Sequence, residues 1–295
     1  MQRKQGYLIT AYKDYDALYE LISFLSEEDK VFVHVDKKST EIGEKEISEL
    51  NELKNCTAIS LYSVAWGSYN HVRAFLALLD MACKDEEISY LHFLTGEDFP
   101  VYSPQQIHER FVDEEHLYLN YIEEKDFNEA VQKRYRYYNF FPNKNAKNPV
   151  LRQLQNVIAG VQKIFGVNRK SLGEFDTIYK GLVYVSIPSD AGRDILSYVK
   201  NHPEYEKALY RCQLPEEFFF HTILLNETFC NGKWKKLIVD KDLRYMNWDR
   251  GDGASPVYLA EEDMPALMTG DWYFARKFHG GDSNSLKERI VEKFW

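Results

Sequence analysis

The sequence predicts an α/β protein in which a mostly parallel central sheet is flanked by helices. The main observation is that short apolar strand patterns alternate with helical patterns along residues 1–100. Strands separated by helical patterns of about 10–15 residues are typical of βαβ units, whose strands run parallel. A second observation is the length of 295 residues, which is enough to bury a large core. No internal repeat or linker composition divides the chain, so we expect one domain over residues 1–295.

The expected elements of this first region follow each other in order. Apolar and β-branched runs predict strands at residues 7–10, 31–35, 58–61 and 90–94. Apolar residues at helical spacing predict helices at 15–25, 41–53 and 68–83. In parallel sheets, ligands bind beyond the carboxyl ends of the strands. Asp36 and the turn at residues 95–98 both follow such ends and are candidate ligand-binding positions.

Further along the chain the pattern changes. Residues 133–138 interleave basic and aromatic side chains, and residues 143–148 form a polar loop. Residues 151–165 have apolar positions at helical spacing, with basic residues around them, so we expect a helix that packs on its own protein. The alternative is that such a basic amphipathic helix lies on an anionic membrane surface. A buried strand is expected at 182–187 and a further helix begins at Pro215.

Composition excludes several classes of protein. The formal net charge is -9, so binding to nucleic acid through overall charge is not expected. The cysteines are widely spaced, without metal-ligand pairs, and we expect free thiols in a reducing compartment. Neither a secretory signal pattern nor an apolar run of membrane-spanning length occurs in the sequence. We therefore expect a cytoplasmic protein.

The segment Pro215-Glu216-Glu217 carries the clearest chemistry. Proline suits the first position of a helix, which would put Glu216 and Glu217 in the first turn. The apolar run that follows indicates burial, so at least one carboxylate is expected where water is scarce. Such a carboxylate could act as a general base toward a hydroxyl group. The alternative is that both are ordinary acidic residues of a first helical turn.

Other polar residues are individually ambiguous. Asp36 could hold a ribose or base, or could instead cap the next helix. Glu97 and Asp98 form an acidic turn, and Arg276 with Lys277 could neutralise a phosphate or form a solvated pair. The histidines at 34, 71, 92 and 221 do not have metal-site spacing and are expected in the core or at the edge of a site. Phosphate-loop, dinucleotide-binding and nucleophile-elbow motifs are absent from the sequence.

Taken together and in order, the motifs resemble the core-2/I-branching β-1,6-N-acetylglucosaminyltransferases, a family that also includes the peptide O-xylosyltransferases. The resemblance extends from about residue 7 to about residue 280. The segments that carry it are Val33–Ser39, Val64–Ser68, Leu94–Val101, Lys180–Ser186, Pro215–Glu217, Leu243–Trp248 and Phe274–Phe278.

This resemblance implies a GT-A-like, Rossmann-type nucleotide-sugar transferase fold that works without a divalent metal ion and inverts the anomeric centre. The family's catalytic base matches Glu217, and Glu216 becomes a neighbour that tunes it. The family's diphosphate-binding lysine matches Lys277, and its acceptor-side tryptophan matches Trp248. Asp36 would lie in the uridine pocket. The other expected donor-side residues are Trp66 and Gly67.

One family position is not matched. The second phosphate-binding cation, an arginine, falls near Ala254, and Arg250 or Arg276 is the candidate replacement. The other expected acceptor-binding residues are Glu97, Asp98, Arg134, Arg136 and Glu216. We expect the nucleotide-binding half to cover about residues 1–125, and the acceptor-binding and catalytic half about residues 126–295.

The leading hypothesis is therefore a bacterial-type inverting glycosyltransferase that moves a sugar from a UDP-sugar to a glycan hydroxyl. GlcNAc is the first expected sugar, and xylose or another hexose the second. The acceptor would be a glycan or lipid-linked saccharide in surface polysaccharide biosynthesis, with peripheral contact to the inner membrane surface. No cofactor or metal is expected. A non-catalytic glycan- or nucleotide-binding protein is the alternative, and a glycoside hydrolase, which would need a second carboxylate such as Glu97 or Asp98, is the third.

Overall fold

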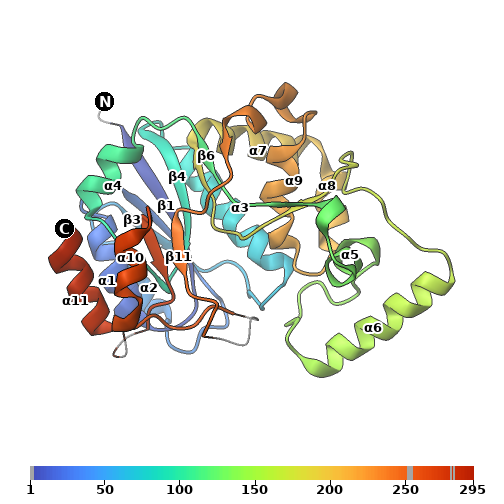
Figure 1. The fold of residues 1–295 in the computed structure, drawn as a ribbon, viewed down its shortest axis with the longest axis horizontal. Coiled ribbons are helices and arrows are strands. Elements are labelled where there is room, and N and C mark those ends of the chain that lie inside the picture. The colour runs from blue at the N-terminus through green and yellow to red at the C-terminus, as the bar shows by residue number, and fades with distance from the viewer. Residues whose placement is uncertain (1–2, 251–254, 280, 282) are drawn as a thin grey trace.

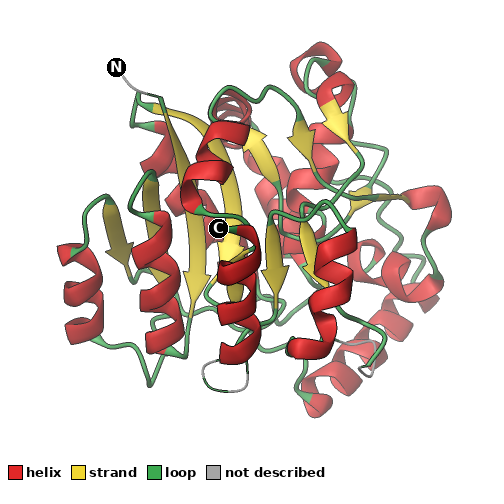
Figure 2. Ribbon diagram, turned by 60° about the vertical axis from the view of Figure 1, so that its left-hand side comes forward, coloured by secondary structure: helices red, strands yellow, loops and turns green. Residues whose placement is uncertain are grey.

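A computed structural model describes residues 3–250, 255–279, 281 and 283–295. Its centre is a seven-stranded sheet with the strand order β10-β6-β9-β4-β1-β2-β3 (Figure 2). The strands are β1 (Lys4–Ala11), β2 (Lys30–Val35), β3 (Cys56–Ile59), β4 (Ile88–Thr95), β6 (Leu117–Tyr118), β9 (Ser186–Pro188) and β10 (Ile238–Val239). Neighbouring strands are parallel except at β9, which is antiparallel to both β4 and β6. The predicted α/β class with a mostly parallel sheet is confirmed.

Helices cover both faces of this sheet (Figure 1). The α-helices are α1 (Tyr15–Leu25), α2 (Glu44–Glu52), α3 (Tyr69–Cys83), α4 (Pro104–Phe111), α5 (Glu129–Arg136), α6 (Pro149–Ile164), α7 (Ser189–Asn201), α8 (Pro203–Tyr210), α9 (Phe219–Leu225), α10 (Met264–Thr269) and α11 (Asn284–Phe294). Side chains alternate between the two faces of a strand. Accordingly, Leu8 and Phe32 pack with α3, α7 and α9, whereas Tyr7 and Val31 pack with α1 and α4.

A second, three-stranded sheet lies beside the central one. It has the order β11 (Arg244–Met246), β12 (Phe274–Arg276), β5 (Asp98–Pro100). β12 runs antiparallel to β5, with Arg276 opposite Asp98. α10 and α11 cover this sheet through a third apolar cluster. The pairing brings the C-terminal motif next to the acidic turn that follows β4. A two-stranded sheet, β7 (Ile122–Glu123) with β8 (Tyr179–Lys180), completes the described strands.

The early elements agree with the sequence predictions. The helix predicted at 15–25 has the same bounds in the structure. The helices predicted at 41–53 and 68–83 are present as α2 and α3, and each is shorter than predicted. Strands are found at each of the four predicted positions, shifted or extended by a few residues. All four cysteines are free thiols, as expected.

Three predictions in the second half are wrong. Pro215 does not begin an α-helix, because Pro215–Glu217 is a 3-10 turn and α9 begins separately at Phe219. Of the strand expected at 182–187, only Ser186 and Ile187 lie in a strand, which is β9. Finally, the helix predicted at 151–165 exists as α6, but most of its apolar side chains face solvent instead of packing on the protein. None of the described helices is long and apolar enough to cross a membrane.

Candidate functional site

A cavity of about 710 Å³ opens at the carboxyl ends of β1, β2 and β4. These strand ends contribute Thr10, His34 and Thr95, and Asp36 follows β2 directly. Segments from distant parts of the chain complete the walls: residues 64–67, 143–147, 182–184, 214–217, 255–256 and 276–277 contribute to the lining. The site therefore lies where α/β sheets commonly bind ligands, as the positions of Asp36 and the turn after β4 predicted.

Glu217 lies on this cavity and is held by two cations. Its Oε2 atom is 2.7 Å from Arg134 Nη1 and 2.9 Å from Lys180 Nζ. Arg134 comes from α5 and Lys180 from β8, so both elements position the carboxylate. The backbone N–H of Gly181 also donates to the carbonyl oxygen of Glu217, at 2.9 Å. The carboxylate is partly exposed toward the cavity, at 21% of its side-chain surface, and a ligand can reach it.

Gly181 permits this arrangement because no other residue would fit there. A Cβ atom at this position would lie 2.3 Å from the Asn120 carbonyl oxygen and 2.3 Å from His221 Nε2. Contacts this short do not occur between real Cβ atoms and their neighbours, and the backbone atom could not move away. Gly181 thus allows β8 to approach the turn that carries Glu217, and it keeps Lys180 within reach of the carboxylate.

Glu216 has a different environment from its neighbour. It is buried, and its Oε2 atom makes no hydrogen bond within the protein. Burial raises the pKa of the Glu216 carboxyl to about 8, and the adjacent Glu217 charge also raises it. Near neutral pH this group therefore keeps its proton. Of the two candidate bases, only Glu217 is held in an ion-paired form at the cavity.

Asp36 lines the cavity and organises the backbone around it. Its Oδ1 atom accepts the N–H of Val64 at 2.9 Å and the N–H of Lys38 at 3.0 Å. It does not cap α2, whose N-cap is Gly43. Trp66 is 45% exposed, and Lys147 Nζ lies 4.8 Å from the centre of its indole ring. A partly exposed aromatic face beside a cation suits a planar or anionic ligand.

Lys277 lies in a group of cations at the same end of the cavity. Its Nζ atom is 2.5 Å from Ser255 Oγ. Burial lowers the pKa of the Lys277 ammonium, Glu97 opposes this shift, and the nearby charges of Arg276, Lys13 and Lys147 lower the pKa further. Such mutual repulsion among cations is relieved when an anion binds between them. The group is therefore suited to a diphosphate.

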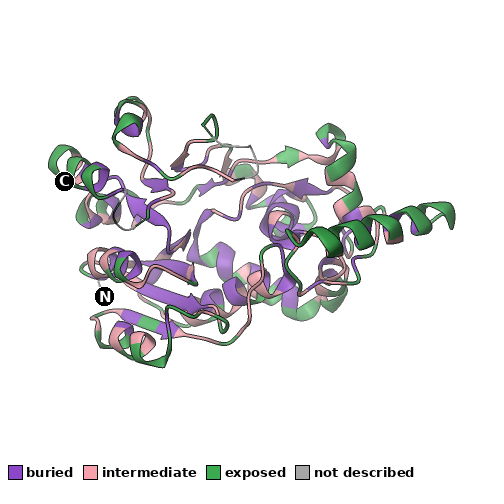
Figure 3. Ribbon diagram, turned by 90° about the horizontal axis from the view of Figure 1, so that it is seen from below, coloured by how far each residue is buried: buried purple, intermediate pink, exposed green. Residues whose placement is uncertain are grey.

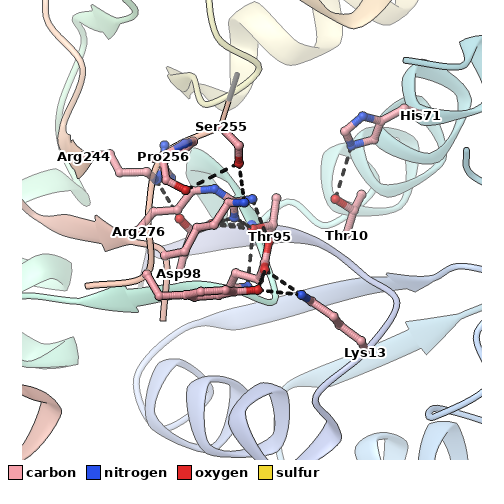
Figure 4. A network of polar contacts seen from close by, with 12 residues as sticks. Thr10, Lys13, His71, Thr95, Asp98, Arg244, Ser255, Pro256 and Arg276 are labelled. Atoms are coloured by element: carbon pink, nitrogen blue, oxygen red, sulfur yellow. Dashed lines mark hydrogen bonds and ion pairs between the residues drawn. The ribbon is translucent and has the colours of Figure 1, made fainter. Parts of the chain in front are cut away.

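The acidic turn after β4 is engaged by arginines and a lysine (Figure 4). Glu97 lies 2.9 Å from Arg276 and 3.0 Å from Lys13. Asp98 lies 2.8 Å from Arg244 and also accepts the N–H of Thr95 at 2.5 Å. Although burial alone would raise the pKa of Glu97, Arg276, Lys13 and Lys277 lower it below its ordinary value. These carboxylates are thus internal partners of the cations around them.

Most of the predicted site residues meet at this cavity. Those that line it are Asp36, Trp66, Gly67, Glu97, Glu216, Glu217, Trp248, Arg276 and Lys277. Arg134 reaches it through Glu217, whereas Asp98 is buried behind Glu97. Arg136 pairs with Glu124 at 3.4 Å and does not line the cavity. Arg250 pairs with Glu262 and Asp263, also away from the cavity lining. Ala254 lies outside the described residues.

Sequence reasoning missed three cations of this cavity or its base, whereas His71 was expected in the core or at the edge of a site. Lys180 was visible only as part of a motif, and nothing in the sequence paired it with Glu217. Lys13 and Lys147 lie in loops whose approach to the cavity depends on the tertiary fold. His71 lines the cavity from α3, with Nε2 3.4 Å from Thr10 Oγ1 (Figure 4). Burial lowers the pKa of His71 to about 4, so its imidazole is neutral near pH 7.

No group of three or more histidine, cysteine or acidic side chains with metal-binding geometry is found among residues 3–250, 255–279, 281 and 283–295. The arrangement that the structure does show is an ion-paired carboxylate, Glu217, and a group of cations around Lys277 on the lining of one cavity. Such a site can take a proton from a nucleophile and accept negative charge on a leaving group.

Residues 6–268 match the model of the Core-2/I-Branching enzyme family. The chain belongs to this family. It is 23% identical over 270 residues to Xylosyltransferase sqv-6 of Caenorhabditis briggsae, covering 84% of this chain and 31% of that protein. It is also 23% identical over 283 residues to a xylosyltransferase of Ciona intestinalis, covering 88% of this chain and 30% of that protein. The chain thus spans about a third of the length of these relatives.

Two solved structures also show similarity. The galactosyltransferase LgtC in complex with donor and acceptor sugar analogues is 11% identical, with a TM-score of 0.35 over 98% of this chain and 94% of that chain. The 4-diphosphocytidyl-2C-methyl-D-erythritol synthase of Anaerococcus prevotii is 9% identical, with a TM-score of 0.34 over 68% of this chain and 75% of that chain. Family membership depends on the sequence match and not on these structures.

Proposed function

We propose that this protein is an inverting glycosyltransferase that moves a sugar from a UDP-sugar to a hydroxyl group of a glycan. The observation that supports this most is that Glu217 and Lys277 line one cavity. Their charges suit the two ends of a displacement reaction, with a base for the nucleophile and a cation for the leaving group. Asp36 and Trp66 would contact the nucleotide, and Trp248 the acceptor. The donor half, residues 1–125, and the acceptor half, residues 126–295, both contribute to the lining.

In this reaction Glu217 takes the proton of the acceptor hydroxyl. The acceptor oxygen forms a bond to C1 of the sugar on the face opposite the leaving group. The bond between C1 and the diphosphate oxygen breaks, and UDP leaves with the electron pair. Lys277 and the cations near it stabilise the added negative charge on the diphosphate. In-line attack of this kind inverts the configuration at C1.

For the donor we propose GlcNAc first and xylose or another hexose second. Two relatives carry the name xylosyltransferase, which supports testing xylose directly. For the acceptor we propose a glycan or lipid-linked saccharide of a surface polysaccharide. Contact with a membrane surface is a separate proposal, because it depends on α6 and not on the cavity.

We also propose that no divalent metal takes part. The support is that Glu97, the acidic residue closest to the cations, already has Arg276 and Lys13 as partners. The same cations could neutralise a diphosphate without a metal ion. Turnover measured in EDTA tests this directly, and we expect full activity. Loss of activity in EDTA that manganese restores would contradict metal independence and would direct attention to Glu97 and Asp98.

The deciding experiment measures UDP release from a panel of UDP-sugars, with and without glycan acceptors. We expect turnover with at least one donor, and we expect Glu217→Gln to reduce it by about 10³-fold or more, while UDP binding is retained. Glu52→Gln, an exposed change on α2, is the matched control and should retain full activity. Normal turnover of Glu217→Gln would exclude this residue as the base. UDP-sugar binding without any turnover would favour the non-catalytic alternative.

A further inference from the structure

α6 presents an apolar face to solvent. The exposed fractions of its large apolar side chains are 71% for Val150, 44% for Leu154, 59% for Val157, 47% for Val161 and 83% for Ile164. Phe165, directly after the helix, is 80% exposed. These positions recur every three or four residues and therefore share one side of the helix. In Figure 3 exposed residues run along this helix at the edge of the molecule, away from the central sheet.

The opposite face of α6 is buried and polar. Gln155 and Gln162 both donate from their side-chain amides to the carbonyl oxygen of Tyr138, at 3.0 Å in each case. The side-chain oxygen of Gln162 accepts the N–H of Tyr138 at 2.8 Å, and that of Gln155 accepts the N–H of Phe140 at 3.3 Å. Ala159 lies between these glutamines and is also buried. These bonds fix the rotation of the helix, so its apolar side faces outward.

Charge around α6 differs from that of the whole chain. Residues 141–173 contain no aspartate or glutamate, although the protein has a net charge of -9. Their basic residues are Lys144, Lys147, Arg152, Lys163, Arg169 and Lys170. Of these, Arg152 and Lys163 are exposed on the helix itself. Both lie on the polar side of the helix. Lys133 lowers the pKa of the Glu129 carboxyl on α5, and Lys163 is close enough to lower it further. A helix with an apolar face and only basic charges of its own is complementary to a surface that combines acyl chains with anionic headgroups.

We propose that α6 docks this protein on the surface of an anionic membrane. The helix lies in the plane of the interface, with Val157, Val161 and Ile164 inserted among the acyl chains. Arg152 and Lys163 then contact lipid phosphates. The docking does not require any step of sugar transfer. The docking proposal can therefore fail while the proposed function holds, and the proposed function can fail while the docking holds.

A second copy of the chain fits this face less well. A helix of 16 residues is ~24 Å long and ~10 Å wide, so its face covers ~240 Å². Stable protein interfaces bury about 800 Å² on each partner, several times this area. Two copies of α6 would also bring like charges together. An anionic bilayer has neither difficulty, because it is continuous and of opposite charge.

Docking through α6 would also place the cavity near the lipid surface. Residues 143–147, which lead into the helix, contribute Asn143, Lys144 and Lys147 to the cavity lining. This consequence rests on the proposed function, since it concerns the acceptor. A saccharide attached to a lipid in the same bilayer could then reach the site without leaving the membrane.

The test is flotation of the full chain with phosphatidylcholine vesicles that contain or lack 30% phosphatidylglycerol, an amount on the order of that in anionic membranes. No sugar substrate is present. We expect binding to the anionic vesicles only, and weaker binding at high salt. Val157→Glu with Ile164→Glu should abolish it, and Arg152→Gln with Lys163→Gln should weaken it about 20-fold. Met268→Glu is the control for adding a glutamate elsewhere, because it places one such charge on an apolar side chain that is 52% exposed on another helix.

Circular dichroism and UDP affinity of the variants confirm that the fold and the cavity are intact. Absence of binding to the anionic vesicles would overturn the proposal, as would equal binding to both compositions. Equal loss in Met268→Glu would overturn it as well. Sedimentation of the free protein as a dimer that Val157→Glu with Ile164→Glu dissociates, without vesicle binding, would assign the face to a second copy instead.

Discussion

Arg134 Nη1 lies 2.7 Å from Glu217 Oε2, and this oxygen is also the one that Lys180 approaches, at 2.9 Å. The two cations therefore converge on a single carboxylate oxygen. This leaves Oε1 of Glu217 without an ion pair in the described structure. We infer that the cations orient the carboxylate, while its second oxygen is available to an acceptor hydroxyl. Arg134 and Lys180 act as positioning residues in this interpretation.

Arg134→Met or Lys180→Met should lower kcat by about 10- to 100-fold, because the base loses its orientation and a counter-charge. UDP affinity should stay within about twofold, since neither charge is among those that shift the pKa of Lys277. Steady-state kinetics and UDP titration separate the two effects. Lys133→Met is the control, because Lys133 precedes Arg134 on α5 but pairs with exposed Glu129 at 3.0 Å. A matching loss in this control would argue against a specific role.

Glu216→Gln should change the pH dependence of stability. In the folded protein Glu216 holds its proton up to about pH 8, whereas the unfolded chain loses it near its ordinary value of 4.5. Folding stability from this group is therefore highest below pH 4.5 and falls as the pH rises to about 8. The glutamine variant lacks this loss and should be more stable than the parent at pH 8 by about 1–3 kcal/mol.

Urea unfolding at pH 5.5 and at pH 8 measures this difference. The advantage of Glu216→Gln over the parent should be larger at pH 8. A difference that does not change with pH would contradict protonation of Glu216. The same variant should retain much more activity than Glu217→Gln, because only Glu217 is proposed to take a proton from the acceptor. Equal loss of turnover in both variants would mean that the adjacent carboxylates act as a pair.

Lys277→Met and Lys147→Met should each weaken UDP binding, by about tenfold, because each removes one charge from the group that would meet the diphosphate. Lys147 is the candidate for the second phosphate-binding cation, since it lines the cavity and its charge lowers the pKa of Lys277. Isothermal titration with UDP and with uridine measures this, and uridine affinity should change little. Lys84→Met, remote on the surface, is the control. Unchanged UDP affinity in Lys147→Met would remove it from the phosphate site.

The sequence was informative where local pattern and tertiary structure agree. The alternation of buried strands and amphipathic helices before residue 95 predicted the βαβ region, because each element there buries its apolar side. The position of Asp36 after a strand was likewise readable. Residues in the second half depend on contacts between distant segments. The pairing of Lys180 with Glu217 requires Gly181 to approach a turn 36 positions later, and no local pattern indicates this.

The orientation of α6 shows a second reason why sequence reasoning failed. Apolar spacing marks the buried side of a helix when burial of apolar surface decides the packing. Here glutamine amides satisfy the backbone of residues 138–140 and so determine which side faces the protein. The same spacing remains informative, but it describes what the helix can bind and not how it packs.

Arg276 differs from the other cations of the cavity in being buried, and this predicts a structural effect on mutation. Its guanidinium pairs with Glu97 at 2.9 Å and with Asp98 at 3.8 Å. Removing one partner of a buried ion pair leaves the other charge uncompensated, which costs about 3–5 kcal/mol. Arg276→Met should therefore lower the free energy of unfolding by about this amount. Arg250→Met removes pairs with exposed Glu262 and buried Asp263, away from the cavity lining, and should leave UDP affinity unchanged. Urea unfolding of both variants, with UDP titration below the transition, separates the roles.

If Arg276→Met is as stable as the parent but binds UDP weakly, Arg276 serves the phosphate and not the fold. If Arg250→Met loses UDP affinity, it reaches the diphosphate when ligand is bound.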